Sequence, residues 1–357
     1  MTDRTVYPFA RNLIGVKWNY LDSVVRPALS TVSAACQIVS KTCAIADKSI
    51  RFKFYTPRLA ERLFPALAHN EAADTGAPDL TIHLWDSAST GVDMPMPWTN
   101  KAFIYEPLDE PDLLREPFCG AYITGEDTIN LYDANANEAY LWMPDANRIP
   151  GWVLAAPARS LLHWFFSRYG VNLVHGAAVG RQGRAVLITA KGSSGKSTTA
   201  LSCVAAGMGY LSDDYVGVAI GDRITVHSFF NSAKLTPQSL NAFPEFDAFV
   251  RDTPPGDNGK SVLYISEAAP EQLLREAPLA AVLIPVLHKA ERTHLVPATK
   301  MQAFLALAPS TVFQLALTGG RVVAPLKALV ERTPCHFLML GPDMREVSSS
   351  IDAFLRG

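Results

Sequence analysis

One stretch of the chain has the residue types and spacing of a phosphate-binding loop. It reads Ala190-Lys-Gly-Ser-Ser-Gly-Lys-Ser197, which fits the pattern G-x-x-x-x-G-K-[ST] except that Ala190 stands where the first glycine is usual. The glycines of such a loop let successive backbone N–H groups point into one concavity, and the helix that follows adds the positive end of its dipole. An apolar segment precedes the loop and a helical segment follows it, as the motif requires. The sequence therefore predicts a site for the phosphates of a nucleotide.

Each residue of this loop has an expected role. Lys196 reaches the β- and γ-phosphates, and the Ser197 hydroxyl coordinates Mg²⁺. The residues expected to contact the bound nucleotide are Gly192, Ser193, Ser194, Gly195, Lys196, Ser197 and Thr198. A simple glycine-serine turn between a strand and a helix is the structural alternative.

Two adjacent carboxylates, Asp213 and Asp214, follow the next apolar segment along the chain. Because α/β sheets bind their ligands at the carboxyl ends of strands, these side chains are expected beside the phosphate loop. One carboxylate can hold Mg²⁺ through water, and the other can accept a proton from an attacking hydroxyl. A turn that uses both aspartates only for capping is the alternative.

One histidine, His175, lies in an apolar segment upstream of the loop and is followed by Gly176. A lone histidine in such a segment is often a core residue with its hydrogen bonds satisfied. Here the glycine allows close backbone approach, and the neighbouring strand ends in the phosphate loop. We therefore expect His175 to be a partner of Asp213 or Asp214.

Two units with different patterns carry these residues. Residues 1–150 predict a strand-rich α+β domain, with a helix after Pro57, and contain no chemical motif of their own. Residues 151–357 alternate strands and helices, which is typical of α/β domains. The elements expected around the loop are a helix at Ala158–Tyr169, strands at Val171–Val179 and Arg184–Thr189, and a helix at Ser197–Ala206.

The composition excludes several classes of protein. Hydrophobic residues make up 48% of the 357 and charged residues 18%, which is typical of a folded chain. A formal charge of −2 argues against a nucleic-acid-binding protein, and five scattered cysteines argue against a disulfide scaffold or zinc ribbon. The longest apolar runs are about ten residues, whereas a membrane-spanning helix needs ~20. With no signal-peptide pattern either, we expect a soluble, cytoplasmic protein without nucleic-acid or membrane partners; a homo-oligomer stays open.

The motifs together resemble those of HPr kinase/phosphorylase. The resemblance lies in the order and spacing of His175-Gly176, Gly195-Lys196-Ser197-Thr198 and Asp213-Asp214. The stretch from Leu162 to Val216 looks still more like the HPr-kinase-like proteins of bacterial peptide-modification clusters, including those that phosphorylate lasso-peptide precursors. The likeness is strong over residues 160–220, weaker from 221 to 345, and places little constraint on residues 1–150.

This resemblance implies a specific fold and activity. Residues 151–357 would form a phosphate-loop kinase core of the HPr kinase and phosphoenolpyruvate-carboxykinase-related type, and residues 1–150 would take part in substrate recognition. The activity would be phosphorylation of a serine hydroxyl in a peptide or protein by ATP and Mg²⁺, the acceptor being a precursor peptide of a ribosomally made natural product. Roles carried onto matching positions make Asp213 the proton acceptor, supported by His175, Lys196 and Asp214. Ser197 and Asp214 then contact the metal.

The sequence departs from this family after the paired aspartates. The bifunctional enzymes have a Glu-Ile-Arg-Gly-type segment there, and residues 220–262 contain none, which argues against phosphorylase activity and against HPr as the substrate. Lys234 and Lys260, the lysines of this stretch, are interpreted as solvated loop residues, with phosphate or substrate contact as the alternative. Arg292 and Arg321 are candidates for an arginine on the γ-phosphate.

Two other functions stay open. A nucleotide-dependent ATPase or regulatory switch needs no phosphoryl acceptor, but many ATPases have Glu in the position of Asp214, and the Asn-Lys-x-Asp motif of GTPases is absent. A small-molecule kinase is compatible too, because the related carboxykinase fold handles small carboxylates.

Overall fold

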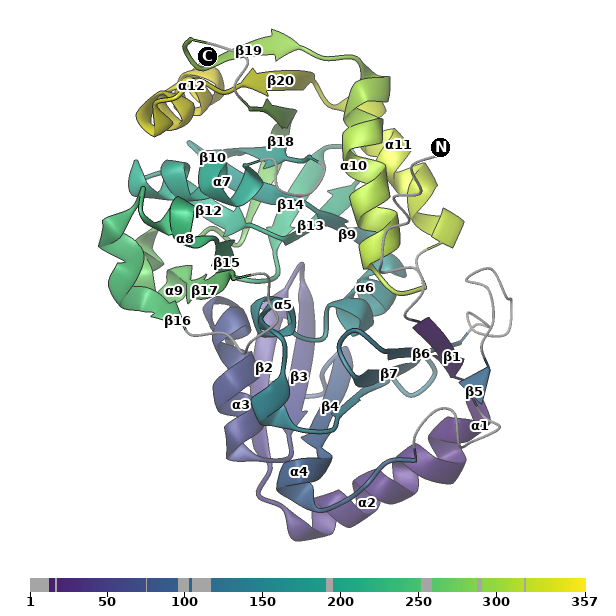
Figure 1. Ribbon diagram of the computed structural model, residues 1–357. Coiled ribbons are helices and arrows are strands. Elements are labelled where there is room, and N and C mark those ends of the chain that lie inside the picture. Colours follow the sequence, from purple (N-terminus) through teal and green to yellow (C-terminus); the bar gives the residue numbers. More distant parts are fainter. Residues whose placement is uncertain are drawn as a thin grey trace, which may run out of the picture.

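A computed structural model describes residues 13–16, 18–74, 76–95, 103–104, 117–190, 195–251, 259–287, 291–317 and 319–357 of the chain. The fold is mixed α/β, and the described strands form sheets of eight, nine and three strands. Figure 1 shows the eight-stranded sheet in the lower half of the molecule and the nine-stranded sheet in the upper half. The candidate site residues belong to the upper half.

The eight-stranded sheet has the strand order β2-β3-β4-β8-β7-β6-β1-β5. β2 and β3 form an antiparallel hairpin whose turn residues, Ala46 and Asp47, have φ angles of 45° and 61°. Two-residue turns with positive φ match the twist of the strands that they connect. β3, β4 and β8 run parallel. The strands are β1 (Leu13–Val16), β2 (Val39–Ile45), β3 (Lys48–Phe54), β4 (Leu80–Asp86), β5 (Phe103–Ile104), β6 (Phe118–Ile123), β7 (Thr128–Asp133) and β8 (Glu138–Met143).

Helix α3 crosses between the parallel strands β3 and β4 and covers their inner face. Its start is well capped, because Pro57 occupies the first turn and the Thr56 hydroxyl accepts the Leu59 N–H at 3.3 Å. The helix predicted after Pro57 is thereby confirmed. The helices of this half are α1 (Trp18–Tyr20), a π-helix (Leu21–Val25), α2 (Arg26–Ala35), α3 (Pro57–Leu63), a 3₁₀-helix (Phe64–Asn70), α4 (Ser87–Thr90), a 3₁₀-helix (Ala146–Arg148) and α5 (Gly151–Ala155).

The nine-stranded sheet has the main order β12-β10-β11-β18-β14-β13-β9, and β20 and β19 continue from β18. β18 runs parallel to β11 and β20, and the other pairs are antiparallel. Its strands are β9 (Val171–His175), β10 (Ala177–Arg181), β11 (Arg184–Ile188), β12 (Gly209–Ser212), β13 (Tyr215–Ile220), β14 (Ile224–Ser228), β18 (Glu276–Val286), β19 (His294–Pro297) and β20 (Cys335–Met339). The small sheet consists of β15 (Ser232–Leu235), β17 (Ser261–Tyr264) and β16 (Val250–Arg251).

Helices cover both faces of the central strands. Ala177 and Val179 of β10 pack in the same cluster as α7 and α12, whereas Ala178 packs in the cluster of α10 and α11. This alternation is what a strand buried on both faces requires. The predicted α/β class is confirmed, and the assignment to a phosphate-loop kinase core stays a prediction. No helix in the described residues is both long and apolar enough to cross a bilayer. The helices are α6 (Arg159–Ser167), α7 (Lys196–Ala205), α8 (Pro237–Leu240), α9 (Ile265–Ala268), α10 (Lys300–Gln314), α11 (Val323–Arg332) and α12 (Met344–Arg356), with 3₁₀-helices at Pro244–Phe249, Pro270–Gln272 and Gly319–Val322.

The single strand predicted for Val171–Val179 is wrong, because the chain changes neighbours at Gly176. β9 pairs with β13, whereas β10 pairs with β11 and β12. A Cβ atom at Gly176 would lie 3.0 Å from both the Ile188 carbonyl oxygen and a Leu187 methyl group, so a side chain there would crowd the next strand. The Gly176 N–H instead donates to the Asp214 carbonyl at 3.0 Å. The switch therefore brings the end of β9 to the turn that holds the paired aspartates.

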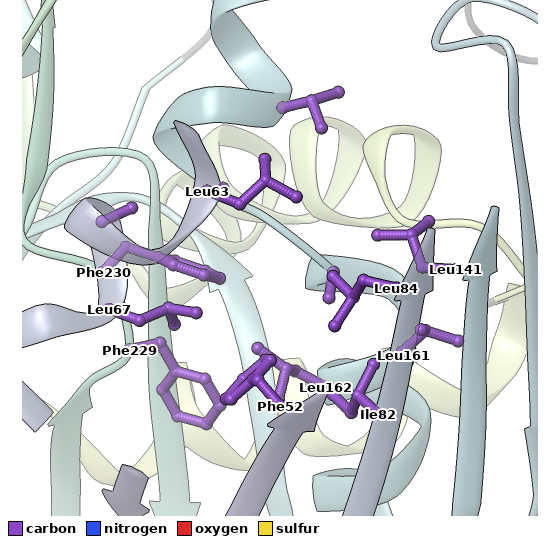
Figure 2. Close-up of a cluster of buried hydrophobic side chains, with 14 of the residues drawn as sticks. Phe52, Leu63, Leu67, Ile82, Leu84, Leu141, Leu161, Leu162, Phe229 and Phe230 are labelled. Carbon is purple, nitrogen blue, oxygen red and sulfur yellow. The ribbon is translucent and has the colours of Figure 1, made fainter. Parts of the chain in front are cut away.

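One hydrophobic core joins the two halves of the chain (Figure 2). The Phe166 and Phe229 rings meet edge to face, with centroids 4.8 Å apart. The residues labelled in Figure 2 are all buried: Phe52, Leu63, Leu67, Ile82, Leu84 and Leu141 come from residues 1–150, and Leu161, Leu162, Phe229 and Phe230 from the rest. Residue 150 therefore separates two sheets that share one core.

A polar network also connects the halves, around His69 of the 3₁₀-helix that follows α3. Asn231 donates to His69 Nδ1 at 3.3 Å, and Nε2 lies 2.7 Å from the Ser228 hydroxyl. The neutral ring that satisfies both contacts has its proton on Nε2. Burial, with a smaller effect of Arg275, lowers the pKa of His69 to about 3. The network therefore requires the neutral histidine.

The shared core predicts that residues 151–357 do not fold alone. Without residues 1–150, the cluster around Leu161 and Phe229 would be exposed, and exposed apolar surfaces of this kind cause association. We expect aggregation or a loss of near-UV circular dichroism for this fragment, and recovery when residues 1–150 are coexpressed as a separate chain. A monomeric fragment that unfolds cooperatively would contradict the shared core.

The His69 network predicts an acid-sensitive stability. The folded-state pKa of His69 is about 3, below the ordinary value near 6.5, so the unfolded chain binds the extra proton first. Stability is complete above the ordinary pKa and falls as the pH drops towards the folded-state pKa, with a loss of about 2 kcal/mol at pH 5. Urea unfolding at pH 7 and pH 5 should show a smaller loss of unfolding free energy for His69→Gln than for the wild-type protein. Equal losses in the two proteins would exclude this role.

Candidate active site

The described end of the predicted phosphate loop leads directly into helix α7. Gly195 has a φ of 88°, a left-handed conformation that favours glycine, and Lys196 is the first helical residue. The Lys196 side chain is buried, and its Nζ donates to the Ala190 carbonyl at 3.2 Å. Of the residues predicted to contact phosphate, Gly192, Ser193 and Ser194 lie outside the described residues. The positions of Gly195 and Lys196 agree with the predicted loop-to-helix arrangement.

The two hydroxyl residues after Lys196 have different neighbours. Thr198 shares a hydrogen bond of 2.9 Å with the Ser239 hydroxyl of α8, which ties α7 to that helix. Ser197 instead lies beside Asp213, where its hydroxyl lowers the pKa of the carboxyl. The structure therefore brings Ser197 to the paired aspartates, whereas Thr198 contacts α8, the helix that follows β15.

Asp213 and Asp214 occupy the turn between β12 and β13, and backbone contacts hold this turn. The Ser212 hydroxyl donates to the Tyr215 carbonyl at 2.6 Å, which bridges the two aspartates. The Asp214 carbonyl accepts the N–H of Gly176. Both aspartates thus follow the carboxyl end of a strand, at the position where α/β sheets bind ligands.

Asp214 contacts one lysine and one histidine. Its carboxylate lies 2.5 Å from Lys234 Nζ and 3.5 Å from His175 Nε2. Burial alone would raise its pKa, but the charge of Lys234 and the hydrogen bond from His175 hold the pKa well below the usual range. Asp214 is therefore an ionised and paired carboxylate whose side chain is only 16% exposed.

Asp213 has the opposite environment. Its Oδ2 accepts the backbone N–H of Lys234 at 3.0 Å, and its Oδ1 is buried with no hydrogen-bond partner among the described residues. Burial and the neighbouring charge of Asp214 raise the pKa of Asp213 above its usual value. Two adjacent aspartates therefore differ in chemistry, one paired and fully ionised and the other with an oxygen available for a ligand or a proton.

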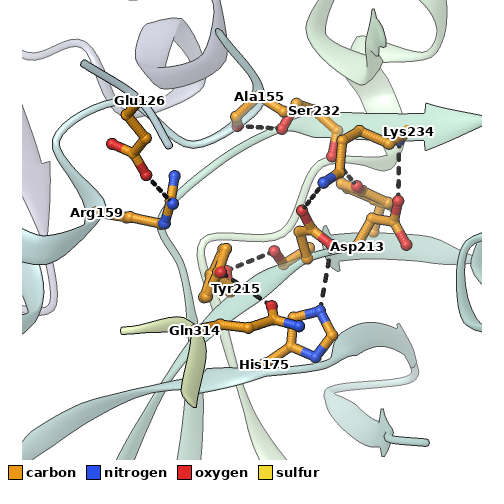
Figure 3. A network of polar contacts seen from close by, with 12 residues as sticks. Glu126, Ala155, Arg159, His175, Asp213, Tyr215, Ser232, Lys234 and Gln314 are labelled. Carbon is orange, nitrogen blue, oxygen red and sulfur yellow. Dashed lines mark hydrogen bonds and ion pairs between the residues drawn. The ribbon is translucent and has the colours of Figure 1, made fainter. Parts of the chain in front are cut away.

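Lys234 organises both carboxylates, and its interpretation as a solvated loop residue is wrong. It lies in β15, and its side chain is only 14% exposed. Ala233 and Leu235 are buried in the cluster on one side of the strand, so Lys234 points to the other side, towards the aspartates. Its backbone holds Asp213 and its amine holds Asp214 (Figure 3). The only sequence signal was a lysine between two apolar residues.

His175 was expected to be a partner of Asp213 or Asp214, and the structure places it beside Asp214. Its backbone N–H donates to the Thr311 hydroxyl at 3.1 Å, and its ring meets the Tyr215 ring edge to face at 5.6 Å. Burial lowers the pKa of His175, partly offset by the hydrogen bond with Asp214. The ring is thus held between α10 and β13, with Nε2 directed at the carboxylate.

A second buried ion pair connects the site with the lower sheet, and sequence reasoning missed it. Arg159, at the start of α6, pairs with Glu126 in the turn between β6 and β7. Its guanidinium also lies 5.5 Å from the centre of the Tyr215 ring, whose hydroxyl donates to Gln314 at 3.1 Å. Figure 3 shows this chain of contacts, from Glu126 through Arg159 and Tyr215 towards His175.

The remaining predicted candidates have other surroundings. Lys260 lies near enough to Lys196 for its charge to lower the Lys196 pKa, after the larger effect of burial. Arg292 is 84% exposed and pairs with Glu346 of α12 at 2.9 Å. Arg321 lines a cavity of about 320 Å³ beside α6. Neither arginine contacts the paired aspartates in the described structure.

The donor set suits a hard cation that is held mainly by other ligands. Among the residues described, no cluster of three or more His, Cys, Asp and Glu side chains is placed to hold a metal. Mg²⁺ in nucleotide sites takes one or two carboxylates, with phosphate oxygens and water as the other ligands. The Ser197 hydroxyl lies near the Asp213 carboxylate, whose Oδ1 has no hydrogen-bond partner among the described residues, and Asp214 is adjacent. These three residues fit that requirement.

Comparison with known proteins leaves the site without an assigned family. No protein-family model matches the sequence, and no curated protein matches it. One similar solved structure is the Hpr(Ser) kinase/phosphatase from Coxiella burnetii, which is 9% identical with a TM-score of 0.29; the match covers 52% of this chain and 94% of that chain. A likeness this distant carries no assignment, so a functional conclusion must rest on the residues.

The contacts of Lys234 predict a strong energetic coupling to Asp214. Replacing Lys234 with Met leaves a largely enclosed carboxylate that has lost its cationic partner and keeps only His175, which should lower the free energy of unfolding by about 3 kcal/mol. The double variant Lys234→Met/Asp214→Asn should recover much of this loss, because neither charge is then buried alone. Urea unfolding of the single and double variants at pH 7 measures the coupling. Purely additive losses would exclude the ion pair.

Proposed function

We propose that this protein is an ATP- and Mg²⁺-dependent kinase that phosphorylates a serine hydroxyl of a peptide or protein. The observation that supports this most is the buried Asp213 oxygen, which has no hydrogen-bond partner among the described residues and belongs to a carboxylate beside Ser197. A carboxylate in this position, next to a helix that starts with a buried lysine, provides both parts that phosphoryl transfer to a hydroxyl requires. These parts are a phosphate site and a proton acceptor.

The phosphate site is proposed at the start of α7. Lys196 would exchange its contact with the Ala190 carbonyl for phosphate oxygens, and the N–H groups of the first turn would donate to them. The remaining proposed contacts are from Gly192, Ser193, Ser194, Gly195 and Thr198. Ser197 and Asp214 would hold Mg²⁺, Asp214 through water because its oxygens are engaged by Lys234 and His175. The metal, when bound, neutralises charge on the phosphates.

The proton acceptor is proposed to be Asp213. A serine hydroxyl that attacks the γ-phosphate must lose its proton, and an unpartnered carboxylate oxygen can take it. Lys234 holds the other oxygen of Asp213 and also neutralises Asp214. His175 supports the arrangement by orienting Asp214. The two aspartates would therefore act together: Asp214 is held in place by its partners, and Asp213 has an oxygen available to accept the proton.

The finer specificity is proposed from the sequence resemblance. The acceptor would be a precursor peptide of a ribosomally made natural product, as in the HPr-kinase-like peptide kinases. The buried Glu126–Arg159 pair supports a role for the lower sheet, because it connects that sheet with Tyr215 beside the site. A substrate bound to the lower sheet would thus lie on the sheet that the Glu126–Arg159 pair connects with the proposed catalytic residues.

A transfer assay with [γ-³²P]ATP tests this proposal. Candidate precursor peptides, proteins and small alcohols are offered as acceptors, and label on a peptide serine is the expected result. Asp213→Asn should then lower kcat by at least ~10²-fold, because it removes the basic oxygen but keeps the shape of the side chain. The matched control is Asp222→Asn in the exposed turn between β13 and β14, which should leave kcat unchanged.

Other outcomes select other functions. Label on a small alcohol would indicate a small-molecule kinase, and free phosphate alone would indicate an ATPase or switch. If Asp213→Asn is fully active and Asp214→Asn is inactive, the two aspartates have exchanged roles. Full activity of both variants would show that the aspartate pair is only a structural turn.

A further inference from the structure

A wide groove lies between β2, the edge strand of the lower sheet, and the segment that connects β17 with β18. It has a volume of about 880 Å³ and runs between β2, α3 and the following 3₁₀-helix on one side and the segment from Ser266 to Arg275 on the other. Figure 1 shows α9 and β17 above α3 and β2 at this place. The groove does not include the paired aspartates. It is therefore a surface additional to the candidate active site.

The edge of β2 has outward-pointing backbone groups beside this groove, which Val39 and Lys41 of the same strand line. In an antiparallel pair, residues alternate between bonding to the partner strand and pointing away from it. The Thr42 carbonyl points away from β3, since it accepts the N–H of Ala72 at 2.9 Å. Ser40, two residues earlier, points the same way and has no backbone partner beyond β2 among the described residues. The bridge between Cys43 and Glu71 covers the edge beyond this point, so the open part of β2 runs from Ser40 to the start of the strand. An unpaired strand edge is a template for another extended chain.

The lining of the groove suits the side chains of an extended chain. Val39, Phe64 and Ala68 give it apolar surface, and side chains of a strand alternate, so every second one would enter the groove. Most charged groups at the rim already have partners: Lys41 with Glu71 at 2.7 Å and Glu267 with Arg251 at 2.6 Å are examples. A ligand need not neutralise them.

Arg275 is the exception at the rim. It is exposed, and its guanidinium has neither an ion pair nor a hydrogen bond with the described residues. An unpaired arginine on an apolar groove attracts a carboxylate, which it can bind through two parallel hydrogen bonds. The charge of the groove therefore favours a chain that has an acidic side chain at this end.

The groove is connected to the candidate active site by one short hydrogen-bonded path. Ser266, which lines the groove, donates through its hydroxyl to Asn231 Oδ1 at 3.0 Å. Asn231 immediately precedes β15, the strand that carries Lys234. A chain held in the groove would thus contact Ser266, which is one hydrogen bond away from the residue before the strand of Lys234.

We propose that this groove docks an extended peptide segment, which adds to the edge of β2 as a strand and places an acidic side chain on Arg275. The inference rests on the proposed function in one respect: the docked chain would be the substrate of the kinase. The main-chain contacts with Ser40 would provide affinity, and Val39, Phe64 and Arg275 would select side chains. The docking site is thus separate from the residues that bind phosphate.

A binding measurement without ATP tests this docking site independently of catalysis. The full chain is used to select peptides from a phage-displayed library of random dodecapeptides, and the affinity of a selected peptide is measured by fluorescence polarisation. Ser40→Pro removes the outward N–H from an edge strand, where proline is tolerated, and should weaken binding about tenfold or more. The matched control Ser40→Val keeps that N–H and should bind within about twofold of wild type. Arg275→Glu should weaken the acidic peptides specifically.

The outcomes separate this inference from the proposed function. Equal melting temperatures for the Ser40 variants show that Ser40→Pro folds, so a loss of binding is due to the edge. Selection of no peptide above background, or equal binding to wild type, Ser40→Pro and Arg275→Glu, would overturn the docking site. A wild-type dimer that Ser40→Pro converts to a monomer would overturn it too, because the edge would then pair two copies. Failure of the chain to transfer phosphate would overturn only the kinase.

Discussion

Two adjacent buried carboxylates cannot share one site unless their charge is compensated, and this constraint organises the centre of the molecule. Lys234 provides the compensation through a side chain on Asp214 and a backbone N–H on Asp213. Because one residue contacts both, β15 must lie beside the turn that follows β12. His175 completes the arrangement, which requires β9 to end at Asp214. The break of the strand at Gly176, next to His175, therefore brings this histidine to the charged centre.

The same centre depends on residues far away in the sequence. Arg159 lies over the Tyr215 ring, and Glu126 from the lower sheet pairs with its buried guanidinium. The apolar cluster of Figure 2 contains side chains from both halves of the chain and joins them as well. Because the core and this ion pair both span residue 150, the lower sheet is part of the structural support of the site. A role in substrate recognition would build on that support.

The sequence predicted the local parts of the structure well. Lys196 at the start of a helix, Gly195 before it and the aspartates after a strand follow from short motifs whose physics is local. Lys234 and Arg159 were not predicted, because their partners come from distant segments and a single sequence has no signal for such pairs. The division of the strand at Gly176 was missed because its cause is the backbone of β11, which only the folded sheet brings close.

Calorimetric titration of the full chain with ATP in the presence of Mg²⁺ tests the central claim most directly. The account predicts binding of one nucleotide per chain, and a loss of at least about tenfold in affinity for Lys196→Ala, since a buried charge-assisted contact to phosphate is removed. Arg223→Ala, in the exposed turn between β13 and β14, serves as the matched control for loss of a positive charge and should bind as wild type does. No heat of binding for the wild-type chain, or equal affinity of the Lys196 variant, would contradict a phosphate site at the start of α7.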